Sequence, residues 1–124
     1  MKNCSSKSKI HIKKRAYWYA LKIIKLLDQL PKSDYSSGVI AKQLLRSATS
    51  IGANIIEAQS ASSKKDFTNY LQYSLESANE SKFWLGLLRD SNKASKESVD
   101  PWLVETKELA NILASSILTL KGKK

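Results

Sequence analysis

The chain has 124 residues, 42% of them hydrophobic and 26% charged, which is enough for one domain with its own hydrophobic core. Its single cysteine excludes an intrachain disulfide, and no apolar run is long enough to cross a membrane, so we expect a cytoplasmic protein. The net charge of +10 lies at the ends, because residues 1–15 carry six Lys or Arg and residues 121–124 carry three Lys, with no acid in either. We therefore predict a basic, flexible arm over 1–15, a nearly neutral folded body over 16–120 and a basic tail over 121–124.

The first predicted helix runs from about residue 16 to residue 30 and ends before Pro31. Residues at helical spacing form its predicted core face: Tyr17, Ala20, Leu21, Ile24 and Leu27. Tyr17, Trp18 and Tyr19 are consecutive, so they span about 200° around a helix and cannot all face one core.

The second predicted helix spans about residues 37–60 and follows a turn, "PKSDYSSG", that offers serine N-caps. Its apolar face consists of Ile40, Leu44, Ala48, Ile51 and Ile55. Away from that face lies a polar stripe made of Arg46, Ser50, Asn54 and Glu57. The stripe is interpreted either as hydrogen-bonding groups between helices or subunits or as a solvated surface, and spacing alone does not separate the two. Gly52, on the apolar shoulder, would allow a neighbouring helix to approach closely.

The third predicted helix begins after Ser63, which with Asp66 resembles a capping box, and ends near residue 91. Its predicted inner face carries Phe67, Leu71, Ser74, Ala78, Leu85 and Leu88. The fourth helix is predicted to begin at Asp100-Pro101, an acidic cap followed by proline, and to end at Gly122. Its apolar residues are Leu109, Ile112, Leu113, Ile117 and Leu120.

Four helices joined by short loops predict an all-α fold, an antiparallel up-down-up-down four-helix bundle. In this topology the start of the first helix, the second connection and the end of the fourth helix lie at the same end. The predicted nucleic-acid-binding residues therefore gather there: Lys7, Lys9, Lys13, Lys14, Arg15, Lys64, Lys65, Lys121, Lys123 and Lys124. The alternative is that these lysines only keep the protein soluble.

Large apolar side chains occur on more than one face of the first and third helices, which favours a homo-oligomer. The predicted interface residues are Trp18, Tyr73, Trp84 and Leu87. The alternative is that these are singly exposed aromatic residues of a monomer, which are common.

Nothing in the sequence predicts catalysis, a metal site or a cofactor site. His11 is the only histidine, the carboxylates form no metal-binding motif, and the four glycines are too scattered for a phosphate-binding loop. We therefore expect a protein that is not an enzyme. An intersubunit site at Arg46 and Glu57 is the remaining alternative.

The stretch "RSATSIGANIIEAQ", followed by "KKDFTNYLQYSLESANESKFWLGLLRDS", resembles the four-helix-bundle proteins encoded in intervening sequences of bacterial large-subunit ribosomal RNA genes. The matching positions are Arg46, Ser50, Ile51, Asn54, Ile55, Glu57, Asp66 and Phe67. The resemblance covers about residues 16–120, and Ala58 departs from it, because the family usually has glycine there.

This resemblance implies the same bundle, a homopentameric ring, and kinship with the accessory variability protein of diversity-generating retroelements, a basic pentamer associated with reverse transcriptase and RNA. It also implies that Arg46, Ser50, Asn54 and Glu57 bond between helices or subunits. The resulting hypothesis is a non-catalytic oligomeric accessory protein that contacts RNA or DNA through its basic ends. The alternative is a protein-protein interaction scaffold that binds a protein partner and no specific nucleic acid.

Overall fold

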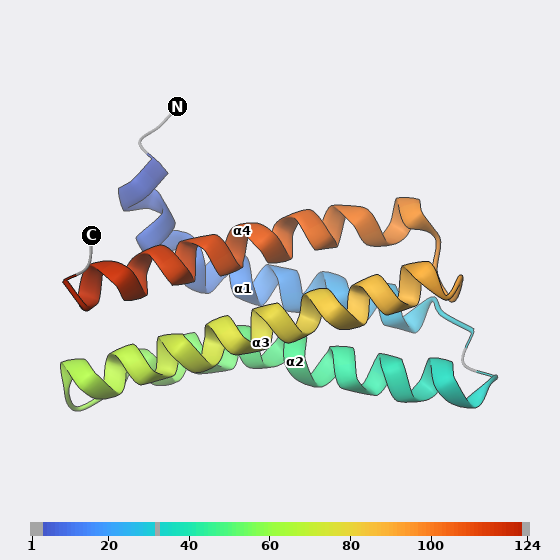
Figure 1. Ribbon diagram of the computed structural model, residues 1–124, viewed down its shortest axis with the longest axis horizontal. Helices are drawn as coiled ribbons and strands as arrows, with labels where there is room; N and C mark the ends of the chain where they lie inside the picture. The colour runs from blue at the N-terminus through green and yellow to red at the C-terminus, as the bar shows by residue number, and fades with distance from the viewer. Residues whose placement is uncertain (1–3, 32, 123–124) are drawn as a thin grey trace.

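The computed structural model describes residues 4–31 and 33–122, with side chains from residue 12 onward. Within those ranges it contains four helices and no strand: α1 (Cys4–Asp28), α2 (Tyr35–Gln59), α3 (Lys64–Asp90) and α4 (Lys96–Leu120). The helices alternate in direction, each packs against the next, and α4 returns beside α1 (Figure 1). The predicted antiparallel four-helix bundle is therefore confirmed.

Helix α1 begins at Cys4, well before residue 16, where the sequence predicted its start. Residues 4–15, expected to form a separate arm, continue the helix in the structure. Figure 1 shows that the first turns of α1 lean away from the other three helices, whereas the rest of α1 lies along the bundle.

The predicted core face of α1 is wrong at Tyr17, Leu21 and Ile24, which are 69%, 42% and 38% exposed, whereas Leu27 is buried as predicted. The other buried positions of this helix are Ala16, Tyr19, Ile23 and Leu26, and Leu30 is buried just beyond its end. Both sets have helical spacing, so periodicity could not choose between them. The small side chain of Ala16 lets α1 lie close to Gly52 of α2, where an added Cβ would be only 3.4 Å from the Ala16 Cβ. The close approach expected at Gly52 is thus seen.

Helix α2 is capped by Asp34 rather than by one of the predicted serines. The Asp34 carboxylate accepts hydrogen bonds from the Ser37 backbone N at 3.2 Å and from the Ser37 hydroxyl at 3.0 Å. Lys93, in the connection between α3 and α4, donates to the same carboxylate oxygen at 2.7 Å. The Lys93 ammonium, followed by the Ser37 hydroxyl, holds the pKa of Asp34 far below its usual range. One carboxylate thus joins two loops at the same end of the bundle.

Helix α3 follows the prediction more closely. Ser63 is its N-cap and accepts a hydrogen bond from the Asp66 backbone N at 3.0 Å, as the sequence predicted. The Asp66 carboxylate accepts from the Ser62 hydroxyl, so the reciprocal bond of a capping box is replaced by one to a neighbouring serine. Most of the predicted inner face is buried, namely Leu71, Ser74, Ala78, Leu85 and Leu88, and Phe67 is half-buried.

The predicted start of the fourth helix at Asp100-Pro101 is wrong, because α4 begins at Lys96. The Ser95 hydroxyl caps it by accepting from the Ser98 backbone N at 3.2 Å. Asp100 instead accepts a hydrogen bond from Arg89 of α3 at 2.9 Å. Pro101 is the sixth residue of the helix, so its missing N–H leaves the backbone bond to the Glu97 carbonyl unmade, near the beginning of α4.

The centre of the core contains a buried polar layer, defined here as four hydroxyl side chains, one from each helix: Tyr19, Ser47, Ser81 and Thr106. Tyr19 Oη lies 2.6 Å from Thr106 Oγ1, and Ser47 Oγ lies 2.8 Å from Ser81 Oγ. Burial raises the pKa of Tyr19 to about 12. Because an unpaired buried hydroxyl is costly, this layer favours the helix register in which all four groups meet.

Candidate functional surfaces

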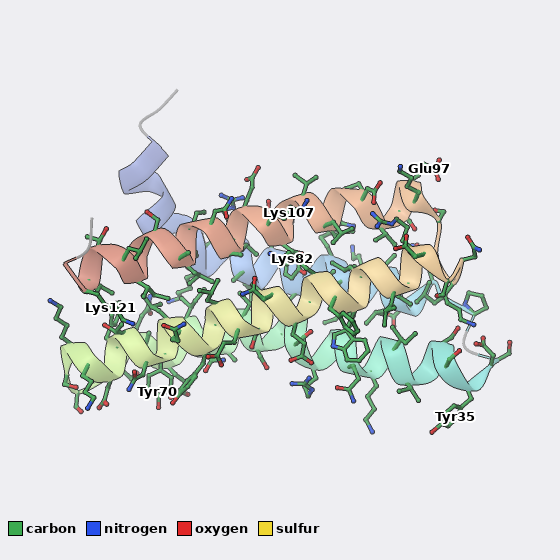
Figure 2. The ribbon with its side chains drawn as sticks, in the orientation of Figure 1. Tyr35, Tyr70, Lys82, Glu97, Lys107 and Lys121 are labelled. Atoms are coloured by element: carbon green, nitrogen blue, oxygen red, sulfur yellow. The ribbon has the colours of Figure 1, made fainter. Side chains whose placement is uncertain are left out.

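Five exposed lysines lie at or toward the end of the bundle where α2 turns into α3 and α4 ends, three of them on α3 and α4 and two on α1 (Figure 1). We call this end the basic pole and define it by Lys13, Lys14, Lys64, Lys65 and Lys121. Figure 2 shows Lys121 at this end, with Lys82 and Lys107 along the body and Glu97 and Tyr35 at the opposite end. The topology thus brings together lysines that are far apart in the sequence.

The lysines of the basic pole are free of ion pairs with any residue that the structure describes. Lys13 donates a hydrogen bond to the side-chain carbonyl of Gln59 at 3.4 Å, an exposed contact. Lys64 and Lys65 occupy the first turn of α3, where the helix dipole disfavours cations. Their position therefore does not help to stabilise the helix.

Arg15 differs from the other predicted nucleic-acid-binding residues because two carboxylates of α4 hold it. Its guanidinium makes two hydrogen bonds to Glu105, at 3.0 and 2.8 Å, and one to Glu108 at 2.8 Å. The bond to Glu105 is the main reason that the pKa of Arg15 is raised. Arg15 thus links α1 to α4 and is not an available cation. Lys123, Lys124 and the side chains of Lys7 and Lys9 lie outside the described part of the chain.

The polar stripe on α2 makes one bond to another helix. Arg46 pairs with Glu80 of α3, and the same carboxylate accepts from the indole N–H of Trp84 at 2.9 Å. Ser50 and Asn54 bond instead to carbonyl oxygens of their own helix, at 2.8 and 2.9 Å. Glu57 is exposed. Sequence reasoning missed Glu80, although its spacing of four residues from Trp84 places the two on one helix face.

An open apolar groove of about 960 Å³ runs between α1 and α2 on the outside of the bundle. We call it the α1–α2 groove; its main lining residues are Tyr17, Leu21, Ile24, Thr49, Gly52 and Ile56. Lys13 and Lys14 line it toward the basic pole. The groove contains four of the five residues that the sequence had assigned to the core of the first helix, namely Tyr17, Ala20, Leu21 and Ile24.

The four predicted interface residues lie in different surroundings. Trp18 is half-exposed and packs edge-on against Trp102 of α4, with 5.7 Å between ring centroids. Tyr73 is 49% exposed, and Leu87 lies on the same side of α3. Trp84 is half-buried and packs against the core. Phe83, which the sequence did not single out, is 59% exposed.

In the part of the chain that the structure describes, no three His, Cys, Asp or Glu side chains are grouped as metal ligands would be. None of the helices, over their described residues, is long and apolar enough to span a bilayer.

The sequence matches the 23S rRNA-intervening sequence protein family over residues 8–115. The chain belongs to this family. A solved member of the S23 ribosomal protein family from Bacteroides thetaiotaomicron, described as a protein of unknown function, is 36% identical to this family member. The two superpose with a TM-score of 0.79 over 86% of this chain and 97% of the other. No curated protein matches the sequence.

The family assignment confirms the resemblance drawn from "RSATSIGANIIEAQ" and the third helix. The solved relative has the same fold at an identity that makes common ancestry clear, and the match spans nearly all of that chain. Its description assigns no activity. For this 23S rRNA-intervening sequence protein, function therefore has to be argued from its surfaces.

Proposed function

We propose that this protein is a non-catalytic, homo-oligomeric accessory protein, a pentamer as the family resemblance implies, that contacts RNA or another nucleic acid through its basic pole. The observation that carries the proposal is the presence of five exposed lysines, without ion-pair partners in the described structure, at one end of the bundle. The family name, which connects these proteins with 23S rRNA, supports RNA as the ligand and the cytoplasm as the location.

Lysines on a bundle end act as point charges for phosphate. Each phosphate that a lysine neutralises releases condensed counterions, so several weak contacts add up to an affinity that falls steeply with salt. Such contacts position a nucleic acid without reading its bases. The proposed binding is therefore largely independent of sequence.

The first test is a comparison of two variants with the same change in net charge. The pole variant replaces Lys64, Lys65 and Lys121 with Gln, and the body variant replaces Lys42, Lys82 and Lys107 with Gln. Substitution is preferable to removal of residues 1–15, because that deletion would also remove Arg15 and its links to Glu105 and Glu108.

Binding to a fluorescently labelled RNA stem-loop is measured by anisotropy over a range of salt concentrations. We expect the pole variant to bind more weakly and to lower the slope of log K against log salt by about 2 to 3, since each lost phosphate contact removes roughly 0.7–0.9. The body variant should keep the slope of the native protein. Equal losses in both variants would mean that the pole is not the contact surface. The absence of measurable RNA binding by the native protein would favour the protein-protein scaffold instead.

A further inference from the structure

We propose that copies of this chain associate by a heterologous contact, in which the outer face of α3 of one copy fills the α1–α2 groove of the next. This inference rests on the proposed oligomer and names the two surfaces that form it. In a heterologous contact the two surfaces differ, so the copies form a closed ring or an open chain rather than a two-fold dimer.

The outer face of α3 carries a line of exposed side chains. We define the α3 ridge as Tyr73, Glu76, Phe83 and Leu87, which follow one another at intervals of three, seven and four residues. These intervals place all four side chains within an arc of about 80° on the helix surface. Three of them are apolar and exposed, and Phe83 is the most exposed of the three.

The groove and the ridge lie at matching heights along the bundle. Helices α1 and α3 run in the same direction (Figure 1), and Tyr19 and Ser81 meet in the buried polar layer. Leu21 and Phe83 each lie two residues beyond that layer. At a rise of about 1.5 Å per residue, these two side chains are therefore at the same height.

The correspondence extends in both directions from this pair. Lys14 and Glu76 each lie five residues before the polar layer, and Ile24 and Leu87 lie five and six residues after it. A rotation axis parallel to the bundle leaves heights unchanged from copy to copy. Such a rotation would therefore set apolar side chains opposite apolar ones and a lysine opposite a glutamate.

The charges of Lys14 and Glu76 are available for this contact. Both side chains are exposed, and neither forms an ion pair with another residue in the described ranges. A groove-to-groove dimer would bring two concave surfaces together and leave the volume between them unfilled. The ridge of a parallel copy fills that volume and keeps every basic pole at the same end of the assembly.

The experiment uses one variant for each surface. Leu21→Glu places a charge in the α1–α2 groove and leaves the α3 ridge unchanged, whereas Phe83→Glu places a charge on the α3 ridge and leaves the groove unchanged. Both positions are exposed, and circular dichroism verifies that each variant folds. Val104→Glu is the matched control, because Val104 is 57% exposed on α4, outside both surfaces, and the charge change is the same.

Masses are measured by light scattering after size exclusion and by native mass spectrometry. We expect the native protein and Val104→Glu to be oligomers and each of the other two variants to be a monomer of 13.9 kDa. A mixture of Leu21→Glu and Phe83→Glu can form only one intact groove-and-ridge contact. It should therefore give a one-to-one heterodimer and nothing larger.

Other results would overturn the inference in distinguishable ways. A native protein that is monomeric would refute both the proposed oligomer and this contact. If the native protein is an oligomer but Phe83→Glu still dimerises by itself, the contact is groove to groove. If Leu21→Glu dimerises by itself, it is ridge to ridge. If the native protein is an oligomer but the mixture of Leu21→Glu and Phe83→Glu stays monomeric, the contact between groove and ridge is also refuted.

A charge exchange tests the height correspondence separately. Lys14→Glu and Glu76→Lys should each lower the oligomer fraction at a given concentration by bringing like charges together. The double variant Lys14→Glu/Glu76→Lys should restore it, because the opposite charges face each other again. A double variant that assembles no better than the single variants would refute the parallel register.

Discussion

Tyr19 decides which side of α1 faces the core. It follows Tyr17 and Trp18 directly, yet it alone of the three is fully buried, with its hydroxyl 2.6 Å from the Thr106 hydroxyl. Tyr17 is exposed, and the half-exposed Trp18 packs edge-on against Trp102. A buried aromatic ring with a polar atom is stable only where that atom is paired, and α4 supplies the partner for Tyr19.

We predict that Tyr19→Phe lowers the free energy of unfolding by about 0.5–1.5 kcal/mol, the usual net contribution of one hydrogen bond. The loss should be modest because Thr106 keeps its bond to a carbonyl oxygen of its own helix. Urea unfolding at neutral pH measures it. Tyr73→Phe, at an exposed tyrosine, is the control and should change stability little.

The raised pKa of Tyr19 adds an alkaline dependence to stability. Between the usual tyrosine pKa near 10 and the folded value of about 12, the unfolded chain has lost a proton that the native protein retains. The neutral Tyr19 hydroxyl makes its full contribution to the free energy of unfolding below pH 10. Between pH 10 and about pH 12 the free energy of unfolding should fall by about 1.4 kcal/mol per pH unit. Tyr19→Phe should lack this component, so its stability curve should be shallower than the native curve over that interval.

At the scale of the helices, one acidic residue joins two loops. Asp34 caps α2 and binds Lys93, which lies in the connection between α3 and α4. Arg89, at the end of α3, similarly reaches Asp100 in the first part of α4. The end opposite the basic pole is thus held by ion pairs, whereas the lysines of the basic pole have none with described residues.

We predict that Asp34→Ala lowers the melting temperature more than Asp34→Asn does, because asparagine can still cap the helix but cannot pair with Lys93. Because the pKa of Asp34 is lowered in the native protein, its stabilising effect is present above the ordinary carboxyl range near pH 4 and is lost as pH falls below it. Thermal unfolding from pH 7 to pH 2 measures this loss. Asp28→Ala, at an exposed carboxylate near the end of α1, is the control.

At the scale of the whole molecule, most of the basic pole lies apart from the apolar side surfaces. Lys64, Lys65 and Lys121 lie at one end, whereas the α1–α2 groove, which Lys13 and Lys14 also line, and the α3 ridge lie along the sides. Association through the sides would therefore leave Lys64, Lys65 and Lys121 open, while Lys14 would face Glu76 of the next copy. In a parallel assembly several basic poles would share one face, and a single nucleic acid could contact more than one of them.

This arrangement predicts that assembly strengthens RNA binding. Phe83→Glu, expected to be monomeric, should bind the RNA stem-loop at least tenfold more weakly than the native protein and with a smaller salt slope, because fewer phosphates are contacted at once. Val104→Glu has the same net charge and should bind like the native protein. Equal affinities of the two variants would mean that each pole binds independently of assembly.

The number of helices and their antiparallel order could be predicted from apolar periodicity, N-caps and loop lengths in the sequence. Apolar periodicity placed the inner faces of α2 and α3, and Ser63 marked the start of α3, because an N-cap acts within a few residues of itself. The start of α4 was misplaced because an acidic residue followed by proline is typical of a helix start. In the structure Asp100 instead accepts a hydrogen bond from Arg89 of α3, and Ser95 caps the helix.

The sequence by itself determined that four amphipathic helices form an antiparallel bundle with its excess lysines at one end, since periodicity, caps and loop length are local properties. Only the tertiary structure decided which of the two apolar stripes of α1 is buried. That choice depends on residues distant in the chain: Gly52 leaves room for Ala16, and Thr106 pairs with Tyr19. The stripe left outside, with Tyr17, Leu21 and Ile24, became the groove, because a helix with two apolar stripes can bury only one of them in its own bundle.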